Sequence, residues 1–458
     1  MLDHVILSRI QFAFTITFHI LFPAFSIGLA SFIALMEGLW LKTKKMIYYD
    51  ICRFFTKIFA LTFGVGVVSG IVMEFQVGTN WSGLSHTAGD ILGALFTYEV
   101  MSAFFIEAGF LGVMLFGWNK VSKRLHFTAT CLVAVGVIIS AFLILIANTW
   151  MQHPVGFIYE NGNFTPDNWL LILSNPMLYP RFFHMVLSAY LATGCVICAI
   201  SGYYLLIKKH DHFAKKVFKF GVIGMAILAP TQLIVGDLVG LDVHHYQPIK
   251  SAAIEGVWNT SKEVPYLIFA IPDQKAEKNY YEIGIPYAAS LINTHTFDGE
   301  LIGLKSVSKD DRPNVAMVFF SFRIMLYLGG LMILVSLLSA YLLYRDKLYD
   351  YPLLYKLWIL IAPAGFVAME CGWFTAESGR QPWVVYEYLR TNLAASNVNR
   401  YQVMASFIVI FMVYVIIFGF FYFKYLFKTI KKGPKRFTDK EINYPFGYLQ
   451  SNSEETKQ

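Results

Sequence analysis

Charged residues are scarce in this chain. Asp, Glu, Lys and Arg make up 15% of its 458 residues, whereas soluble globular proteins contain about 25%. Hydrophobic residues reach 56% and aromatic residues 17%. Such a shortage of charge, combined with so much apolar surface, excludes an ordinary soluble enzyme and indicates a polytopic membrane protein.

Cysteine is also rare. The five cysteines are scattered along the chain, which excludes the disulfide framework of a small secreted domain. Cys195 and Cys198 form a CxxC pair inside an apolar run, and we interpret them as small packing residues. Arg9 interrupts the first apolar run and no small-residue cleavage site follows it, so we expect a retained span rather than a cleaved signal peptide.

Long apolar runs are what the sequence has instead. About nine of them are long enough to cross a bilayer, which takes roughly 20 residues each. The predicted spans cover residues 12–40, 55–79, 92–118, 126–150, 181–207, 217–240, 315–343, 353–374 and 401–427. An open sheet cannot cross lipid, so we expect an all-α fold. The net charge of +7 resides in short connections between spans and does not indicate nucleic-acid binding.

Basic residues mark alternate connections and so predict an orientation. Lys and Arg gather at residues 42–53, 120–124, 208–219, 345–347 and 428–436. The connections 80–91 and 151–180 contain neither. The positive-inside rule then places the N-terminus outside and the C-terminus in the cytoplasm. The predicted divisions are spans one to six (1–240), an outer loop (241–313), spans seven to nine (314–430) and a cytoplasmic tail (431–458).

Several spans contain side chains that hydrocarbon tolerates poorly. A charge at the bilayer centre costs about 2.5–3.5 kcal/mol on insertion scales, so each one needs a reason. The residues concerned are His19, Glu99, Glu107, His184, Arg323 and Glu370, with Met325 close to Arg323. Each also has a purely structural alternative: a satisfied core histidine, a hydrogen bond between helices, or a methionine that fills space.

Glu99 and Glu107 are eight residues apart in "YEVMSAFFIEAGF". On a regular helix this spacing puts both carboxylates on one face, about 12 Å apart. Stacked acids inside a membrane are typical of a proton relay. The alternative is a hydrogen bond between helices.

The depth of the candidate residues gives a second indication. With the N-terminus outside, five of them fall in the outer half of the bilayer: His19, Glu99, His184, Met325 and Glu370. Histidine, methionine and carboxylate together suit haem iron. Arg323, and Arg380 beside Gln381, are suited to pair with haem propionates.

Two other kinds of site do not fit the sequence. The run "FGVGVVSG" (63–70) lacks the spacing of a dinucleotide fingerprint, and its glycines fit close helix packing instead. The helix-borne histidine pair with a third histidine that a haem–copper centre requires is missing, so we do not expect copper.

The sequence resembles subunit I of the cytochrome bd family of quinol oxidases. The likeness extends over nearly the whole chain, from "LSRIQFAFTITFHILFP" through "MEFQVGTNWS" and "ANTWMQ" to "GRQPW". "GRQPW" is the most specific of these motifs. The outer loop is short after "IPDQ", as in family members without the extended insertion. The sequence as a whole is similar to the cyanide-insensitive branch of the family.

The resemblance implies three haems. His184 and Met325 match the axial ligands of a low-spin haem b. His19 and Glu370 fall where the family ligates two high-spin haems, one a haem b and the other a haem d or a further haem b. Glu99 lies where a carboxylate faces that pair and is a possible distal ligand. The haem-adjacent motifs "FRIM" and "GRQPW" contain Arg323, Arg380 and Gln381.

The resemblance also implies a proton path and a quinol site. Glu107 and Ser140 match positions of the proton path from the cytoplasm, and Asn148 lies in the matching "ANTW" segment. Lys250 and Glu255, in "IKSAAIEGVW", match the Lys and Glu of the quinol-oxidising loop.

The expected function is therefore that of a terminal oxidase subunit in a bacterial inner membrane, which oxidises quinol outside and reduces dioxygen to water with cytoplasmic protons. The expected partners are a second membrane subunit, a small single-helix subunit, quinol, dioxygen and the lipid bilayer. Two alternatives remain open. A membrane anchor with one low-spin haem leaves His19 and Glu370 unexplained, and a proton-coupled secondary transporter should show an internal repeat.

Overall fold

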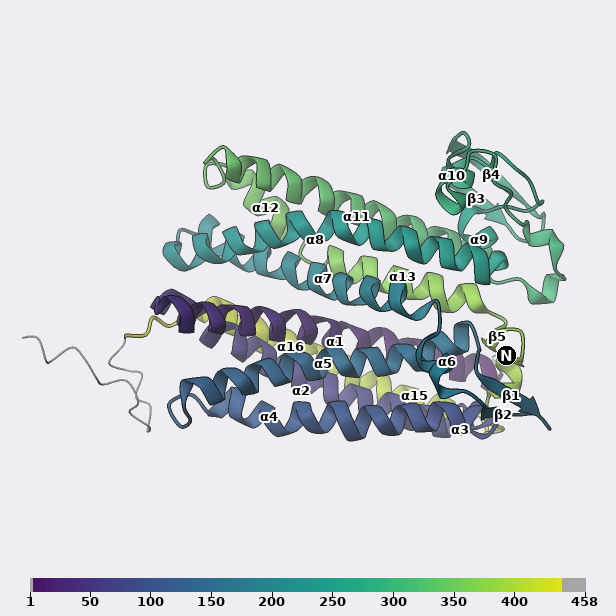
Figure 1. Ribbon diagram of the computed structural model, residues 1–458, viewed down its shortest axis with the longest axis horizontal. Helices are drawn as coiled ribbons and strands as arrows, with labels where there is room; N and C mark the ends of the chain where they lie inside the picture. Colours follow the sequence, from purple (N-terminus) through teal and green to yellow (C-terminus); the bar gives the residue numbers. More distant parts are fainter. Residues whose placement is uncertain (1–2, 439–458) are drawn as a thin grey trace, which may run out of the picture.

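The computed structural model describes residues 3–438, without the side chains of residues 102–104, so most of the predicted tail (431–458) lies outside the described residues. The described chain is a bundle of long helices (Figure 1). Nine helical segments among these residues are long and apolar enough to cross a membrane: His4–Thr43, Met46–Thr79, Ser82–Phe116, Lys123–Gln152, Trp169–Leu206, Asp211–Tyr246, Lys309–Tyr344, Pro352–Arg380 and Arg400–Lys432. The prediction of an all-α membrane fold with about nine spans is confirmed.

Several spans comprise more than one element. The helices within the spans are α1 (His4–Thr43), α2 (Met46–Thr79), α3 (Ser82–Tyr98), α4 (Phe105–Phe116), α5 (Lys123–Gln152), α6 (Trp169–Leu173), α7 (Leu178–Leu206), α8 (Asp211–Tyr246), α11 (Val315–Tyr344), α12 (Pro352–Leu360), α13 (Ala364–Arg380), α15 (Arg400–Met412) and α16 (Phe421–Lys432). Two π-helical turns, Glu99–Phe104 and Val413–Phe420, join α3 to α4 and α15 to α16.

Short elements occupy the connections. They are the hairpin β1–β2 (Phe157–Glu160, Asn163–Pro166), α9 (Pro248–Glu255), the hairpin β3–β4 (Tyr266–Asp273, Lys278–Ile285), α10 (Ala288–Thr294), the 3₁₀ turns Leu304–Ser306 and Lys309–Asp311, the pair β5–β6 (Trp383–Val385, Leu389–Arg390) and α14 (Thr391–Ala394). All three strand pairs are antiparallel.

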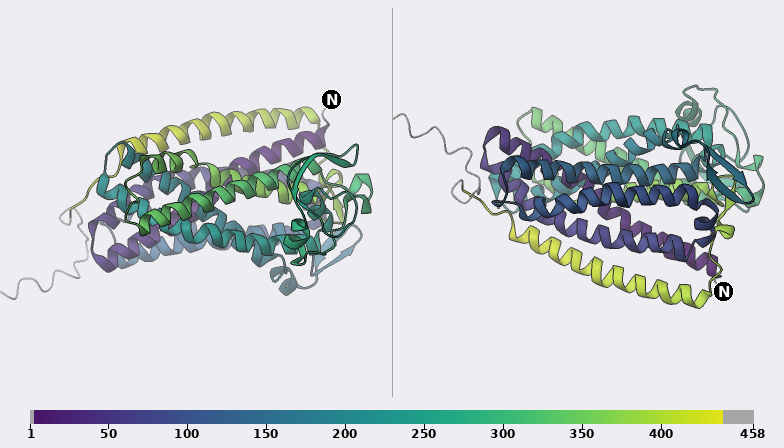
Figure 2. Two further views of the ribbon diagram at one scale, coloured as in Figure 1. Left: turned by 90° about the horizontal axis from the view of Figure 1, so that it is seen from above. Right: turned by 60° about the horizontal axis from the view of Figure 1, so that its bottom comes forward.

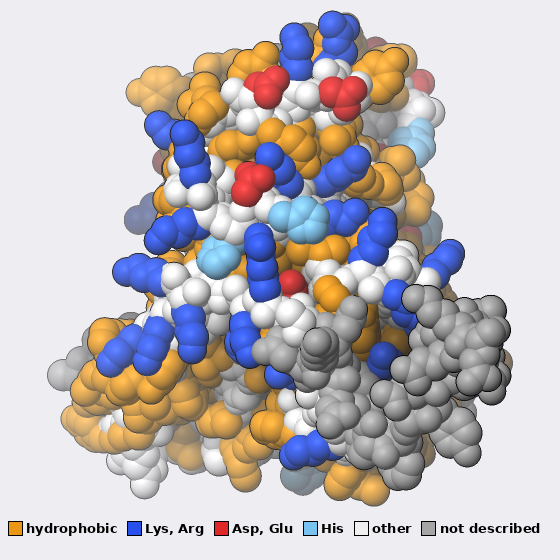
Figure 3. All heavy atoms as spheres, turned by 90° about the vertical axis from the view of Figure 1, so that its left-hand side faces the viewer, with side chains coloured by type: hydrophobic (Ala, Val, Ile, Leu, Met, Phe, Trp, Pro, Cys, Tyr) orange, Lys and Arg blue, Asp and Glu red, His pale blue; other side chains and the backbone are white. Residues whose placement is uncertain are grey.

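The two ends of the bundle differ in character. At one end lie the start of α1, the β-hairpins, α9 and α10 (Figure 1); we name this the loop end. Side chains of Lys and Arg crowd the opposite end (Figure 3), which we name the basic end. The connections that the sequence marks as basic therefore gather on one face of the molecule.

Helix starts follow from local capping. The side chain of Asp3 accepts from Ile6 N at 2.8 Å and begins α1. Asn314 begins α11 in the same way, since its side chain accepts from Met317 N at 3.0 Å. Such caps satisfy backbone donors that have no partner within the helix.

Prolines explain where the eighth span differs from its predicted range. Pro363 has no backbone N–H, and the helix is interrupted there, between α12 and α13. The second part then runs to Arg380 rather than to residue 374. It ends just before Pro382, which disfavours the helical conformation in the residue that precedes it.

Four helices surround one region of the interior. Helix α7 packs against α8 and α13, and α11 packs against the same two helices. Helix α1 packs against α2, α5 and α7. The last span, α15–α16, runs along the edge of the bundle (Figure 2).

Candidate functional site

His184 and Met325 project from α7 and α11, which α8 and α13 both contact. A Cβ added to Gly236 of α8 would lie 3.1 Å from His184 Cε1. A Cβ added to Gly372 of α13 would lie 3.0 Å from Met325 Sδ. Helices α8 and α13 thus each place a glycine against one of these two side chains. The absence of a Cβ at these two positions lets both side chains approach the facing helices closely, in the core of a bundle, where cofactor sites are commonly built.

The imidazole of His184 has one satisfied nitrogen. Its Nε2 lies 3.3 Å from the Gln232 amide nitrogen, which also donates to His184 O at 3.1 Å. Among the described residues, the buried Nδ1 has no hydrogen-bond partner. A buried ring nitrogen without a partner is costly. Ligation of iron through Nδ1 would require the ring proton on Nε2 and the Gln232 amide turned so that its oxygen, which also has no partner among the described residues, accepts it.

His19 lies between α1 and α2. Its Nδ1 is 2.9 Å from Ser69 Oγ, and the Ser69 hydroxyl donates to Gly66 O at 2.9 Å. The hydroxyl therefore accepts from Nδ1–H, which leaves a lone pair on Nε2 for a metal. A Cβ on Gly70 would lie 3.0 Å from His19 Cε1. Gly66 lies against Phe22, so Gly66 and Gly70, two of the three glycines in the run 63–70, allow α1 and α2 to approach closely.

Glu370 lies in the middle of α13. Within residues 3–438, neither of its buried carboxylate oxygens has a hydrogen-bond partner. Ten residues later, Arg380 donates to Glu377, while its buried Nε and Nη1 have no partner in the same part of the chain. Helix α13 thus carries a carboxylate without hydrogen-bond donors, Glu370, and a guanidinium with two unused N–H donors, Arg380, among the described residues. This combination fits a bound group that has both a metal ion and acidic substituents.

Glu99 and Glu107 both face α5. The Ser140 hydroxyl donates to Glu99 Oε1 at 2.5 Å, and a Cβ on Gly136 would lie 2.8 Å from Glu107 Cγ. Residues 136 and 140 are one turn apart on α5 and share a face. The sequence argument assumed a regular helix between the two acids, whereas the structure inserts a π-helical turn at Glu99–Phe104. Such turns are frequent at functional sites.

Lys250 lies on α9 and is fully buried among polar groups. Its Nζ donates to Gln152 Oε1 at 2.5 Å and to Gln247 Oε1. Burial lowers the pKa of Lys250 well below its usual value, and the positive charge of Arg181 lowers it further. A Cβ on Gly379 would lie 2.6 Å from Lys250 Cγ, so the stem of Lys250 lies against the end of α13.

The partners of Lys250 continue into a buried network. Glu377 Oε1 accepts from Asn148 at 2.9 Å and from Gln152 at 3.0 Å. Arg181 Nη2 donates to Asn148 Oδ1 at 2.6 Å. The network connects α9 to α5, α7 and α13 through side chains alone.

Glu255 ends α9 on a different side from Lys250. Five residues on a helix turn through about 500°, so the two side chains point about 140° apart. Glu255 pairs with Arg323 Nη2 at 3.1 Å and accepts from Asn293 at 3.2 Å. Glu255 is thus the anionic partner that an intramembrane Arg323 needs. The other guanidinium donors of Arg323 bond to Leu267 O and Ile254 O.

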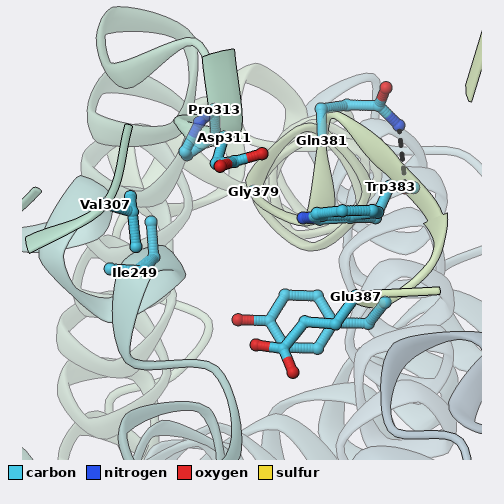
Figure 4. A pocket seen from close by; sticks show the side chains of 9 residues that line it. Ile249, Val307, Asp311, Pro313, Gly379, Gln381, Trp383 and Glu387 are labelled. Carbon is cyan, nitrogen blue, oxygen red and sulfur yellow. Dashed lines mark hydrogen bonds between the residues drawn. The ribbon is translucent and has the colours of Figure 1, made fainter. Parts of the chain in front are cut away.

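A small pocket lies between α9, the segment before α11 and the chain that follows α13. Its cavity volume is about 140 Å³. Ile249 and Val307 face Gln381 and Trp383 across it (Figure 4). Glu387 also lines the pocket. Gln381 itself is held by Trp383 O at 3.5 Å and by the Thr391 hydroxyl at 2.7 Å.

Several polar residues at these sites were missed by the sequence argument. They are Gln152, Arg181, Gln232, Gln247, Asn293 and Glu377. Glu377 follows Glu370 by seven residues on one helix, the kind of spacing that drew attention to Glu99 and Glu107. Arg181 is an arginine at the start of an apolar run. The other four are uncharged and carry no comparable signal.

The fold and the site define a multi-pass membrane protein with imidazole, thioether and carboxylate groups aimed into its interior. The model of one family, cytochrome bd terminal oxidase subunit I, matches residues 7–434. The chain is 38% identical over 451 residues to cytochrome bd ubiquinol oxidase subunit 1 of Bacillus subtilis (strain 168), covering 94% of both chains. It is 34% identical over 484 residues to cytochrome bd-II ubiquinol oxidase subunit 1 of Escherichia coli (strain K12), covering 90% of this chain and 94% of the relative.

A solved structure is also similar. The chain matches a chain of the bd oxidase from Geobacillus thermodenitrificans with a TM-score of 0.88 and 26% identity, covering 94% of this chain and 99% of that one. This protein therefore belongs to the cytochrome bd terminal oxidase subunit I family. Membership implies haem cofactors and a second subunit as partner.

Proposed function

We propose that this chain is the subunit of a quinol:oxygen oxidoreductase that holds the haems and oxidises quinol. The family and the relatives named as ubiquinol oxidases support this function. The observation that carries it is the set of buried polar atoms without hydrogen-bond partners among the described residues: both carboxylate oxygens of Glu370 and the Nε and Nη1 of Arg380.

His184 and Met325 hold a low-spin haem b. His19 and Glu370 hold two high-spin haems, one of haem b and one of haem d or a further haem b. When bound, a haem with two axial ligands supplies electron transfer, and one with a single protein ligand leaves a position open for dioxygen. Glu99, whose carboxylate already accepts from Ser140, would be a further ligand at this pair of haems.

The chain also binds the acidic edges of these groups. The partner-free Nε and Nη1 of Arg380 are suited to a propionate, since paired N–H donors bind carboxylates strongly. Gln381 adds an amide beside it. Arg323 belongs to the same set by its motif, although its donors contact Glu255 and two backbone carbonyls.

The loop end of the bundle faces outward from a bacterial inner membrane, and the basic end faces the cytoplasm. The crowding of Lys and Arg at one end (Figure 3) supports this orientation through the positive-inside rule. Residues 241–313 are then the outer quinol loop, and the tail 431–458 begins in the cytoplasm.

Protons for dioxygen reduction move along the face of α5. Glu107 takes a proton from the basic end, and Ser140 orders the carboxylate of Glu99 that receives it. Buried acids of this kind serve proton relays in membranes. The hydroxyl of Ser140 can both donate and accept, which suits a relay.

Quinol gives up its protons at α9. The lowered pKa of Lys250 favours a neutral amine, which keeps its two hydrogen bonds to glutamine oxygens and retains a lone pair for a quinol proton. Glu255, on another side of α9, is the second acceptor. The nearby pocket of about 140 Å³ suits one six-membered ring, because an engineered cavity of about 150 Å³ holds benzene.

Quinol protons are released outside and the protons for dioxygen reduction enter from the cytoplasm, so charge separates without a pump. The working complex contains this chain, the second membrane subunit and a small single-helix subunit. The ligand residues proposed here are assigned to haem iron, and no copper is expected in the complex.

A reduced-minus-oxidised spectrum of the purified complex tests this function. A quinol oxidase should show one low-spin haem b and high-spin signals that carbon monoxide shifts. A low-spin signal alone would indicate a membrane anchor. A colourless complex would favour the transporter and contradict the proposal.

A further inference from the structure

The hairpin β3–β4 and the helix α10 expose many large apolar side chains. The most exposed, on these elements and the residues next to them, are Ile268, Phe269, Ile271, Tyr280, Tyr281, Ile283, Ile285, Tyr287, Ile292 and Phe297, with exposed fractions from 40% upward. A surface hairpin in water normally turns such residues to a core on one face and polar residues to solvent on the other. A continuous exposed apolar surface of this kind marks a binding site for a membrane or a protein.

We propose that the apolar surface of β3–β4 and α10 lies in the membrane leaflet at the loop end and contacts lipid. This surface would contact lipid whether the loop end faces outward or toward the cytoplasm. Two independent measures of depth carry the proposal.

The first measure comes from α11. Its Arg323 Nε donates to Leu267 O at 3.1 Å, and its Tyr327 hydroxyl donates to Ile268 O. Tyr327 lies eighteen residues from Arg345, where the helix ends at the basic end, which corresponds to a rise of about 27 Å. The hydrocarbon core is about 30 Å thick. The base of β3 therefore lies at the level where hydrocarbon gives way to headgroups.

The second measure comes from α8. His295, the residue after α10, bonds to Asp237 of α8 at 3.1 Å between Nε2 and Oδ2. Asp237 follows Lys219, the last basic residue before the apolar part of α8, by eighteen residues, again a rise of about 27 Å. Helices on different sides of the loop thus give the same depth.

Several polar groups of the hairpin lie near its turn, whereas Glu282, within β4, accepts from Asn279 at 2.8 Å. Near the turn of the hairpin, Glu277 pairs with Arg312 at 2.7 Å and with Lys309 at 3.1 Å. Gln274 donates to Pro313 O at 3.2 Å. Both contacts lie before the first turn of α11, so the charged turn extends toward water while the apolar base stays at membrane depth. Interfacial elements divide their surface in this way.

The apolar surface is continuous with the outward-facing side chains of the spans. On α8, Leu233, Ile234 and Leu238 are exposed, as are Ile324, Leu331 and Leu334 on α11. These residues belong to apolar spans of a membrane protein, and β3 packs on α11 while α10 packs on α8 (Figure 1). Lipid is therefore the occupant that the geometry favours over a soluble partner.

Site-specific fluorescence quenching on the intact two-subunit complex tests the proposal. Ile283→Cys and Phe269→Cys would be labelled separately with an environment-sensitive fluorophore in nanodiscs of phosphatidylethanolamine and phosphatidylglycerol. Lys278→Cys near the hairpin turn is the aqueous control, and Leu334→Cys on α11 is the lipid control. The native protein, labelled in parallel, corrects for its own cysteines, of which four are buried and Cys131 is half-buried.

Doxyl-labelled lipid should quench the labels at 283 and 269 clearly more than the label at 278, and iodide should quench them clearly less than the label at 278. Iodide quenching as strong as at 278 would place the hairpin in water. Protection from both quenchers would mean that a protein covers the surface. Either result overturns the proposal, and the haem spectrum of each variant verifies that the complex has assembled.

Discussion

Arg323 and Glu255 form an ion pair in which both side chains are at least 97% buried. Nη2 and Oε2 are 3.1 Å apart, with exposed fractions of 3% and 2%. The pair joins α11, a membrane span, to α9, which carries Lys250. The conformation of the proposed quinol loop therefore depends on a charge inside the span, and substituting each member of the pair tests that dependence.

Replacing one member of this pair should be costly. Glu255→Gln leaves the Arg323 guanidinium buried without a counter-charge, and breaking a buried pair from one side typically costs about 3–5 kcal/mol. We expect a lower thermal midpoint for the complex and slower quinol oxidation. Thermal unfolding followed by loss of the haem spectrum measures the effect.

The double variant Glu255→Gln with Arg323→Met separates charge from catalysis. Removing both charges should restore most of the stability but not the quinol oxidation rate. Equal recovery of both quantities would show that Glu255 acts only as a structural partner of Arg323.

The glycine opposite Met325 gives a second prediction. Gly372→Ala places a methyl group 3.0 Å from the Met325 sulfur, and overpacking of this kind costs about 1–3 kcal/mol. The low-spin haem signal should fall while the complex remains in the membrane. Gly329→Ala on α11 is the matched control, because nothing in the described part of the chain lies within 4 Å of its added Cβ. Equal loss in both variants would contradict the role given to Gly372.

Much of the fold could be predicted because its determinants are local. Apolar run length gives the spans, and lysine and arginine placement separates the two ends. The first and last residues of the spans were less predictable. Pro363 interrupts the eighth span, and α13 continues through Glu377 to Arg380, since helix ends depend on backbone partners rather than on apolar composition.

Without the family resemblance, side-chain chemistry indicates mainly the titratable members of the proposed site. His19, Glu99, Glu370 and Arg323 stand out because hydrocarbon penalises them. Gln152 and Gln247 do not stand out, although they hold Lys250, because an uncharged amide costs little and its partners come from distant parts of the chain. Gly236 and Gly372 could not be singled out from the sequence either, because their importance comes from the side chains that they face, His184 and Met325.

A third prediction separates the two carboxylates of α13. Glu370→Gln should remove one high-spin haem signal, because its partner-free oxygens are the proposed ligand. Glu377→Gln keeps the shape of the network but removes the counter-charge of Arg380, so we expect weaker haem retention without selective loss of one signal. Absorption and carbon monoxide difference spectra distinguish these results. Selective loss of the high-spin signal in Glu377→Gln instead would move the ligand to Glu377.

The proton path gives a fourth prediction. Glu107→Gln should slow oxygen uptake on the order of a hundredfold, the low end of what a positioned proton donor contributes, with haem content unchanged. Ser140→Ala should have a smaller effect, because it removes the 2.5 Å bond to Glu99 but no titrating group. Asp90→Asn on α3, an exposed carboxylate, is the control. Normal turnover in Glu107→Gln would remove this residue from the path.

The buried amine of Lys250 gives the last prediction. Lys250→Met keeps an unbranched stem against Gly379 and removes the proton acceptor, so quinol oxidation should fall on the order of a hundredfold. Oxidation of an artificial one-electron donor should be spared. Lys275→Met near the exposed hairpin turn controls for loss of a positive charge in the same loop.

The pH dependence follows from the direction of the pKa of Lys250. Burial lowers this pKa, so the amine is neutral above the lowered value and becomes protonated as the pH falls through it. A protonated amine has no lone pair, and quinol oxidation by the native protein should therefore decline on the acid side. In Lys250→Met that acid limb should disappear from a profile of steady-state rates against pH. A limb that persists unchanged in the variant would assign the titration to another group and leave Lys250 with a binding role alone.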